Sequence, residues 1–189
     1  SARYGATGTC ASTAVTGTAA AVVGGTEYVL SANAAATPNN KINLYNGSTG
    51  ACIVGTAPAG PATTMWPVNM EYISSEAKLF VLYYPFTGAS TNAQIWSFDV
   101  TGATVNNGTL IYNDTAGEIT SISTTPQNLS SAMRYYTNGV EKFVLVGTSN
   151  NTVLKLNYAS GTLEKDTSLP FIYGNVFARS ISDIFVIAR

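Results

Sequence analysis

Four copies of one short pattern, an aromatic residue followed by two aliphatic residues, constrain the fold of this chain more than any other feature. The copies are Tyr28-Val29-Leu30, Phe80-Val81-Leu82, Phe143-Val144-Leu145 and Phe185-Val186-Ile187, at separations of 52, 63 and 42 residues. They belong to short apolar runs that lie between clusters of Gly, Asn, Ser, Thr and Pro, a pattern typical of strands and turns. The clearest runs are 27–30, 78–84, 94–100, 142–147, 152–158 and 184–187. Strongly helix-forming stretches are missing, so the sequence predicts one all-β domain over residues 1–189.

The first three copies are followed by the same succession of elements. After a polar loop comes a strand that alternates apolar and polar residues, as a half-buried strand does. A turn with glycine and a third short strand follow, and a further strand is expected before each triplet. The alternating strands are Ile42-Asn43-Leu44, Trp96-Ser97-Phe98 and Leu154-Lys155-Leu156, the third strands lie at 50–53, 108–111 and 161–163, and the preceding strands at 70–74, 132–136 and 176–180.

A unit of about four short strands that recurs every 40 to 60 residues resembles a β-propeller blade. The ends of the chain fit this resemblance, because the last copy stops after its triplet while Tyr4–Cys10 is similar to Tyr45–Cys52. The resemblance implies a four-bladed, propeller-like repeat closed by the N- and C-terminal strands, with about 47 residues in each blade. A β-sandwich or jelly roll is the alternative, since its buried strands are also apolar. The terminal strands could instead pair with a neighbouring molecule and so build a filament.

The two cysteines, Cys10 and Cys52, give conflicting indications. In the repeat they fall at matching positions, where other copies carry Leu110 and Leu163. Equivalent positions on different blades are normally too far apart for a disulfide, which needs Cα atoms about 4.4–6.8 Å apart. A Cys10–Cys52 bond would therefore contradict the alignment, yet two cysteines in a secreted β domain are ordinarily paired.

The composition excludes several classes of function. The chain has no histidine, which removes Ser-His-Asp catalysis and His-ligated zinc. Nine Lys and Arg against ten Asp and Glu give a net charge of -1, which does not suit a nucleic-acid partner. We expect no catalytic, cofactor-binding or metal-binding residues, and hence no enzyme; a glycoside hydrolase with a carboxylate pair is kept only as a remote alternative. No apolar run approaches 18 residues, so no transmembrane segment is expected.

Aromatic side chains are the most suggestive contact residues, with 11 Tyr, 7 Phe and 2 Trp. Aromatic rings at loop tips could bind glycans or a protein partner. The alternative is that neighbouring aromatics on a strand place one ring in the core and one on the surface. The candidates are Trp66, Tyr84, Phe86, Tyr135 and Tyr136. Candidate N-glycosylation sites are Asn46, Asn107, Asn113, Asn128 and Asn150.

The sparse charge favours a function in surface contact. Charged residues make up 10% of the chain, where about 25% is ordinary. We therefore expect a secreted or cell-surface, non-catalytic structural or adhesive module, which could be a subunit of a surface assembly or filament formed by terminal strand exchange. Its partner would be its own copies, a cell-surface protein or carbohydrate. A monomeric, lectin-like, ligand-binding propeller is the alternative.

Overall fold

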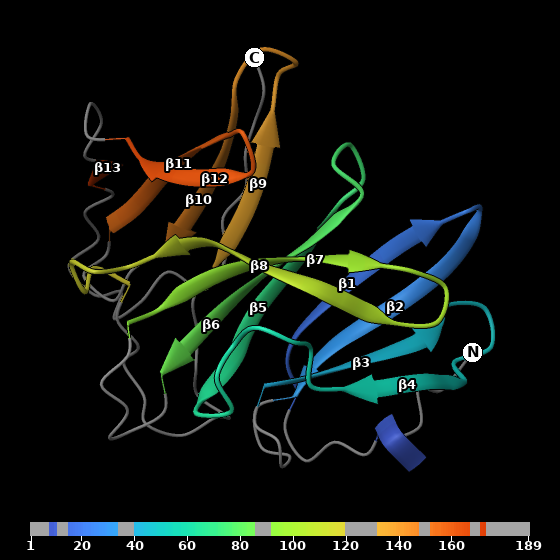
Figure 1. Ribbon diagram of the computed structural model, residues 1–189. Coiled ribbons are helices and arrows are strands. Elements are labelled where there is room, and N and C mark those ends of the chain that lie inside the picture. Colours follow the sequence, from blue (N-terminus) through green and yellow to red (C-terminus); the bar gives the residue numbers. More distant parts are fainter. Residues whose placement is uncertain are drawn as a thin grey trace.

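The computed structural model describes residues 8–10, 15–33, 40–85, 92–119, 132–147, 152–166 and 171–172. Within these ranges three antiparallel sheets follow one another along the chain, and the strands of each sheet pair in sequence order (Figure 1). The single helical element there is a turn of 3-10 helix, η1 (Gly8–Cys10). The expectation of an all-β fold is confirmed.

Each sheet is a meander of four consecutive strands. The first sheet contains β1 (Val15–Val23), β2 (Thr26–Asn33), β3 (Lys41–Asn46) and β4 (Cys52–Thr56). The second contains β5 (Met65–Ile73), β6 (Lys78–Pro85), β7 (Gln94–Val100) and β8 (Val105–Asn113). The third contains β9 (Met133–Thr137), β10 (Lys142–Gly147), β11 (Thr152–Ala159) and β12 (Thr162–Lys165), and the short β13 (Phe171–Ile172) also pairs with β11.

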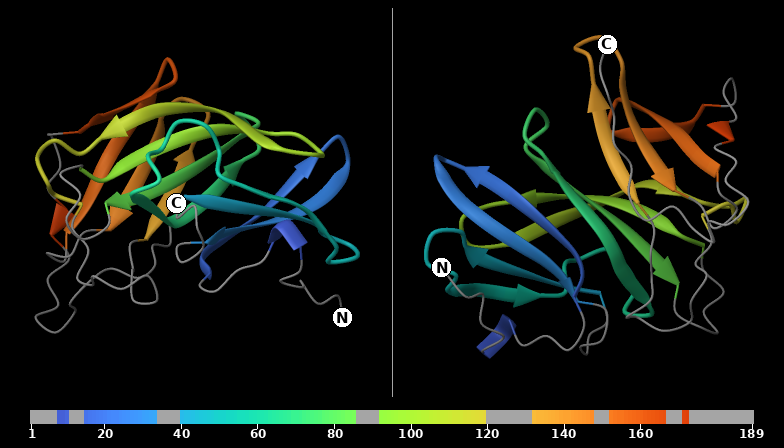
Figure 2. Two further views of the ribbon diagram at one scale, coloured as in Figure 1. Left: turned by 60° about the horizontal axis from the view of Figure 1, so that its bottom comes forward. Right: turned by 180° about the vertical axis from the view of Figure 1, so that it is seen from behind.

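The second sheet lies between the other two, and the three sheets fan out from the side where their first strands meet (Figures 1 and 2). There β1 lies against β5, and β5 lies against β9. The Thr16 hydroxyl of β1 donates a hydrogen bond to the Pro67 carbonyl of β5. We call the side of each sheet that points toward the following sheet its forward face, and the opposite side its rear face.

Two apolar cores fill the spaces between the sheets. On β6, Leu79 and Val81 point into the core shared with the first sheet, whereas Phe80 and Leu82 point into the core shared with the third. All four side chains are fully buried. A strand covered on both faces needs an apolar residue at every position, which explains the unbroken apolar run in β6.

Much of the predicted strand pattern is confirmed. The predicted runs coincide with β7 and β10 at both ends, and the triplets lie in β2, β6 and β10. The strands expected before the second and third triplets are β5 and β9. The sequence did not reveal β1, whose residues are mostly Thr, Ala and Val.

The predicted register of the alternating strands is wrong. Asn46 and Ser97 lie opposite the aromatic residues Tyr28 and Phe80 of their sheets, and Asn157 lies opposite Phe143. The sequence comparison had instead treated Asn43, Ser97 and Lys155, the central residues of the three alternating strands, as equivalent positions. Lys155 is two residues away from the equivalent Asn157, a slip that preserves the alternation, whereas Asn43 is three residues away from Asn46. The pattern alone could not fix this register.

The closing blade predicted from both ends falls outside the described residues, because Phe185-Val186-Ile187 and the segment before Gly8 are not among them. A closed four-bladed ring is therefore not shown. Nor does the two-sheet alternative describe these residues, since they form three successive sheets.

Candidate functional site

The rear face of the first sheet is the first candidate, because its buried residues are polar. Ser31 and Asn33 of β2 and Asn43 and Tyr45 of β3 are all buried there. On the second and third sheets the buried rear-face residues of the middle strands are apolar. This sheet thus differs from the others on the side where a preceding sheet would pack.

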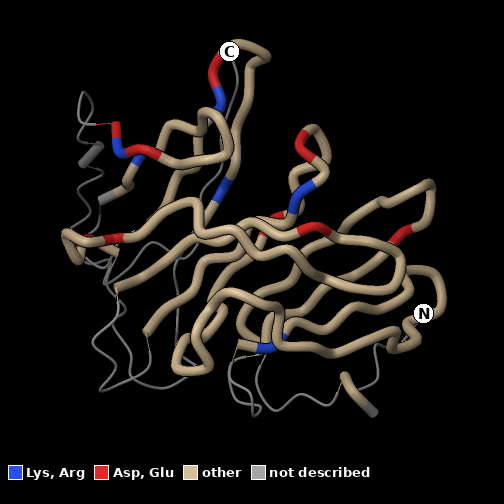
Figure 3. Tube along the Cα trace, in the orientation of Figure 1, with Lys and Arg blue, Asp and Glu red and all other residues tan. Residues whose placement is uncertain are grey.

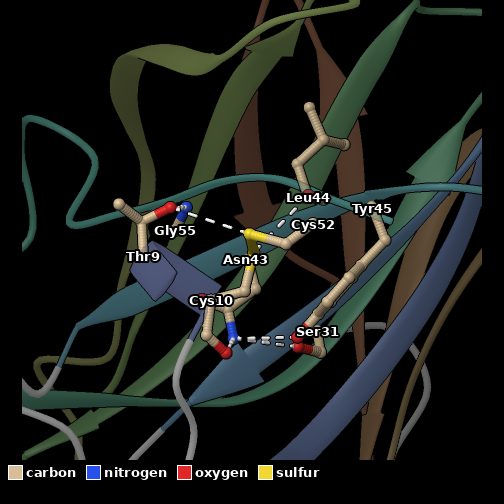
Figure 4. The surroundings of a disulfide bond; sticks show 8 residues. All are labelled: Thr9, Cys10, Ser31, Asn43, Leu44, Tyr45, Cys52 and Gly55. Atoms are coloured by element: carbon tan, nitrogen blue, oxygen red, sulfur yellow. Dashed lines mark hydrogen bonds between the residues drawn. A yellow bond between two sulfur atoms is a disulfide. The ribbon is translucent and has the colours of Figure 1, made fainter. Parts of the chain in front are cut away.

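The segment that covers part of this polar face is η1, and a disulfide holds it there. Cys10 is bonded to Cys52, the first residue of β4, with Cα atoms 5.9 Å apart (Figure 4). Of the two interpretations that the sequence left open, the structure has the disulfide, and the alignment that made the two cysteines equivalent positions on different blades is wrong. Cys10 belongs to a 3-10 turn beside β4 of the same sheet rather than to a third strand.

Asn43 lies at the centre of this contact. Its Nδ2 donates toward the Cys10 carbonyl at 3.3 Å, the Ser31 Oγ at 3.4 Å and the Tyr45 hydroxyl at 3.3 Å (Figure 4). These interactions supply acceptors for the buried Nδ2 group, whose removal from water would otherwise be costly. Asn43 therefore links η1 to two strands of the sheet.

Gly55 of β4 permits the close approach of η1. Its backbone N–H donates to the Thr9 Oγ1 at 3.2 Å. A Cβ at this position would lie 2.0 Å from the Thr9 carbonyl oxygen and 2.5 Å from the Asn43 Oδ1. A side chain larger than hydrogen would displace the turn that the disulfide retains.

The second candidate is a group of charged and phenolic side chains between the second and third sheets. Lys142, at the start of β10, forms an ion pair of 2.5 Å with Glu76 of the β5–β6 turn. The Tyr135 hydroxyl donates to the same Glu76 oxygen at 3.3 Å. The rings of Tyr135 and Tyr158 both pack edge-on against Phe80, with centroids 6.1 and 5.3 Å away. This group joins two sheets through one carboxylate.

Glu71 of β5 adds a second carboxylate on the same face. Its Oε2 accepts a hydrogen bond of 2.7 Å from the Tyr135 backbone N–H. Burial raises the pKa of Glu71, while the Tyr135 hydrogen bond and the positive charge of Arg134 oppose that rise. Burial is also the main reason why the pKa values of Tyr135 and Tyr158 are raised. Both carboxylates are engaged in holding the third sheet against the second.

The aromatic residues proposed as partner contacts do not gather at one site. Trp66 is only 6% exposed and lies in the core between the second and third sheets, which agrees with the alternative of a core ring and not with a contact at a loop tip. Tyr84 and Tyr135 are half-buried against that core. Tyr136 is half-buried on the forward face of the third sheet, where its ring stacks on Phe143 with centroids 4.8 Å apart. Phe86 lies outside the described residues.

Three of the candidate glycosylation sites are in the described part of the chain. Asn107 and Asn113 are exposed, whereas Asn46 is half-buried. The Asn46 Oδ1 accepts hydrogen bonds from the Ser48 and Thr49 backbone N–H groups, and the Asn107 amide donates to Asp99 at 2.7 Å. Asn128 and Asn150 lie outside the described residues.

Charged residues are distributed unevenly over the sheets (Figure 3). The first sheet carries two, Glu27 and Lys41, whereas several lie on the third sheet and its turns. Among the described residues no group of three or more Asp, Glu or Cys could hold a metal ion. The same residues include no helix that is long and apolar enough to cross a membrane.

No protein-family model matches this chain, and comparison with curated proteins and with solved structures found no match either. The fold therefore defines the class by itself: an all-β protein of successive four-stranded meander sheets, the first of them linked to the N-terminal segment by a disulfide.

Proposed function

We propose that this protein is a non-catalytic structural or adhesive module that acts outside the cell, at the cell surface or as a secreted protein. The disulfide supports the compartment, because such bonds persist mainly in oxidising environments. The two buried or ion-paired carboxylates between the second and third sheets support a non-catalytic role, since their contacts hold sheets together.

The observation that carries the proposal is a partly exposed edge strand without charge. β8 is at the edge of the second sheet and contains no Lys, Arg, Asp or Glu. Its residues Asn107, Thr109 and Leu110 are exposed. Natural proteins usually protect such edges with charge, because an open edge pairs readily with another chain. An uncharged edge is suited to a subunit that associates through strand pairing.

Light scattering and electron microscopy of the purified chain test this association over a range of concentrations. We expect assembly that grows with concentration and that Thr109→Lys on β8 weakens at least tenfold, because a lysine on an edge strand opposes pairing. The matched control is Thr162→Lys on β12, a strand that already carries Glu164 and Lys165. A chain that stays monomeric at every concentration would overturn the assembly role.

We also propose a more specific architecture and consider a second function. The first is a propeller-like arrangement, which the face-to-face meander sheets and their adjacent first strands support. Closure of the ring through Cys10 loses support from the disulfide, which places Cys10 beside the first sheet. The second is a lectin-like function. It has less support than association, because Trp66, its largest candidate side chain, is buried; binding on a glycan array would revive it.

A further inference from the structure

The triplets occupy equivalent places in the three sheets. Comparing them shows which side chains of a forward face contact the following sheet. In the triplets of β2, β6 and β10 the aromatic residue and the last aliphatic residue point forward. Tyr28 reaches the second sheet, where a Cβ on Gly102 would lie 2.7 Å from its hydroxyl. Phe80 reaches the third sheet, where it meets Tyr135 and Tyr158. The forward side chains of a triplet are thus the contacts with the following sheet.

The third sheet has these side chains without a described sheet in front of them. Leu30 and Leu82 are fully buried by the sheets that follow them. Their counterpart Leu145 is only half-buried, and so is Phe143. Arg134, Tyr136 and Val153 lie on the same face by strand pairing and are half-buried as well. The forward face of the third sheet therefore keeps the apolar residues of an inter-sheet contact.

One residue on this face departs from the pattern. Lys155 occupies the place of the apolar Leu44 and Ile95, because all three pair with the last residue of a triplet. Its ammonium group is 3.2 Å from Asp166 and 4.7 Å from the centre of the Phe143 ring. The side chains of Lys155 and Asp166 are each 13% exposed. A lysine paired in this way can be covered by another sheet without leaving an unpaired buried charge.

The opposite end of the array is built differently. The rear face of the first sheet is polar and is covered in part by η1, which the disulfide holds in place. Terminal repeats of stacked proteins carry a polar outer face of this kind, whereas internal repeats are apolar on both sides. The two outer faces of the three described sheets therefore differ: the rear face of the first is polar, and the forward face of the third is largely apolar.

We propose that the forward face of the third sheet, defined by Tyr136, Phe143, Leu145 and Val153, is the docking surface for a further sheet, and that the fourth triplet of the same chain supplies it. The fourth triplet, Phe185-Val186-Ile187, has the required sequence and lies beyond the last described residue. In the earlier sheets the middle residue of the triplet points to the rear, as Val81 and Val144 do. The proposed arrangement would therefore bring Val186 to Leu145. The inference concerns architecture and stands whether or not the protein is adhesive.

Cross-linking in the full chain tests which molecule supplies the sheet. A Leu145→Cys, Val186→Cys variant is treated with a bismaleimide that spans about 10 Å, the usual separation of packed sheets. The expected product is a link within one molecule, identified by mass spectrometry of its peptides. A matched control, Val140→Cys with Val186→Cys, uses an exposed residue of the β9–β10 hairpin and should give at most a tenth of that product. A link between two molecules would overturn the assignment in favour of a second copy, and no link above the control would overturn it altogether.

Amide hydrogen exchange gives an independent measurement without new cysteines. We expect Phe185→Ser with Ile187→Ser to accelerate exchange in residues 142–147 about tenfold or more, because the covering sheet is lost. Leu145→Ser should have the same effect, and Val140→Ser should have none. Acceleration by Leu145→Ser alone would show that the fourth triplet is not the occupant.

Discussion

Glu71 is a carboxylate that points from β5 into the contact between the second and third sheets. Its hydrogen bond from the Tyr135 backbone stabilises the ionised form, but removal from water has the larger effect and raises its pKa. The folded protein therefore holds the Glu71 proton more tightly than the unfolded chain does. Because the two states bind this proton unequally, Glu71 makes the stability of the protein depend on pH.

Replacement of Glu71 tests this dependence. The stability contributed by protonation of Glu71 is fully present below its ordinary pKa of 4.5 and is lost as the pH rises through the raised value of the folded state. Glu71→Gln should remove this change and keep an oxygen for the Tyr135 N–H. Urea unfolding between pH 4 and 7 should show the wild type losing stability relative to Glu71→Gln as the pH rises. Glu164→Gln, at an exposed position of β12, is the control and should follow the wild type.

For individual side chains, the triplets predicted the buried Leu30, Phe80 and Leu82 because their positions repeat. The sequence left two places open for Trp66, because a residue next to a loop rich in Gly and Pro can either be exposed there or begin a buried strand. The role of Asn43 could not be predicted either. Its partners Ser31 and Cys10 come from segments far apart in the chain, which only the folded sheet brings together.

Among the elements, η1 is the one whose position depends on a covalent bond as well as on packing. The disulfide spans 42 residues. In the chain-entropy description, closing a loop of that length stabilises the folded state by roughly 4 kcal/mol. Gly55 is needed for the same contact, since its missing side chain leaves room for Thr9. The bond and the glycine thus act on a single contact.

A double-mutant cycle tests whether they do. Gly55→Ala should destabilise the disulfide-bonded protein by about 1–3 kcal/mol, because the new methyl group overlaps the Thr9 carbonyl. In a Cys10→Ser, Cys52→Ser background η1 is free to move away, so the same substitution should cost much less. The measurement is urea unfolding of the four proteins. Equal costs in both backgrounds would show that Gly55 and the disulfide act independently.

The elements themselves divide into those that the sequence predicts and those that it does not. β6 and β10 are predicted well because lysine begins each strand and apolar residues fill it. Lys78 and Lys142 are not merely solvated, since they pair with Asp99 and Glu76 at 2.5 Å. β1 escapes prediction because it lies along β5, where small residues such as Gly17 are needed for the backbones to approach. Small residues carry little periodic signal.

For the whole molecule, the position of the second sheet matters most. Both of its faces are covered, whereas the rear face of the first sheet is covered in part by a short turn and the forward face of the third is half-buried. Opening of β6 therefore requires at least one neighbouring sheet to move away. The three sheets should not be equally resistant to local unfolding.

Native-state amide exchange checks this ranking. We expect the amides of β6 and β7 to exchange at the rate of global unfolding, and those of β2 and β3 to exchange faster through local opening of the first sheet, whose rear face η1 covers only in part. Lys142→Ala, which removes the ion pair with Glu76, should accelerate exchange in the third sheet more than in the first. Uniform rates in all three sheets would instead indicate a single cooperative unit.

The position of the disulfide also constrains the order of events during synthesis and folding. Cys52 is the first residue of β4, so a chain emerging from its N-terminus can close the bond only after the residues of β1, β2 and β3 have already appeared. By that time the first meander lacks only its edge strand. Oxidation of the two thiols could thus fix the first three strands of this sheet before Lys78, Lys142 and the triplet residues of the later sheets have formed their contacts. In newly synthesised protein, formation of this bond would precede folding of the second and third sheets. These sheets would then pack onto a first sheet that is already covalently fixed to η1.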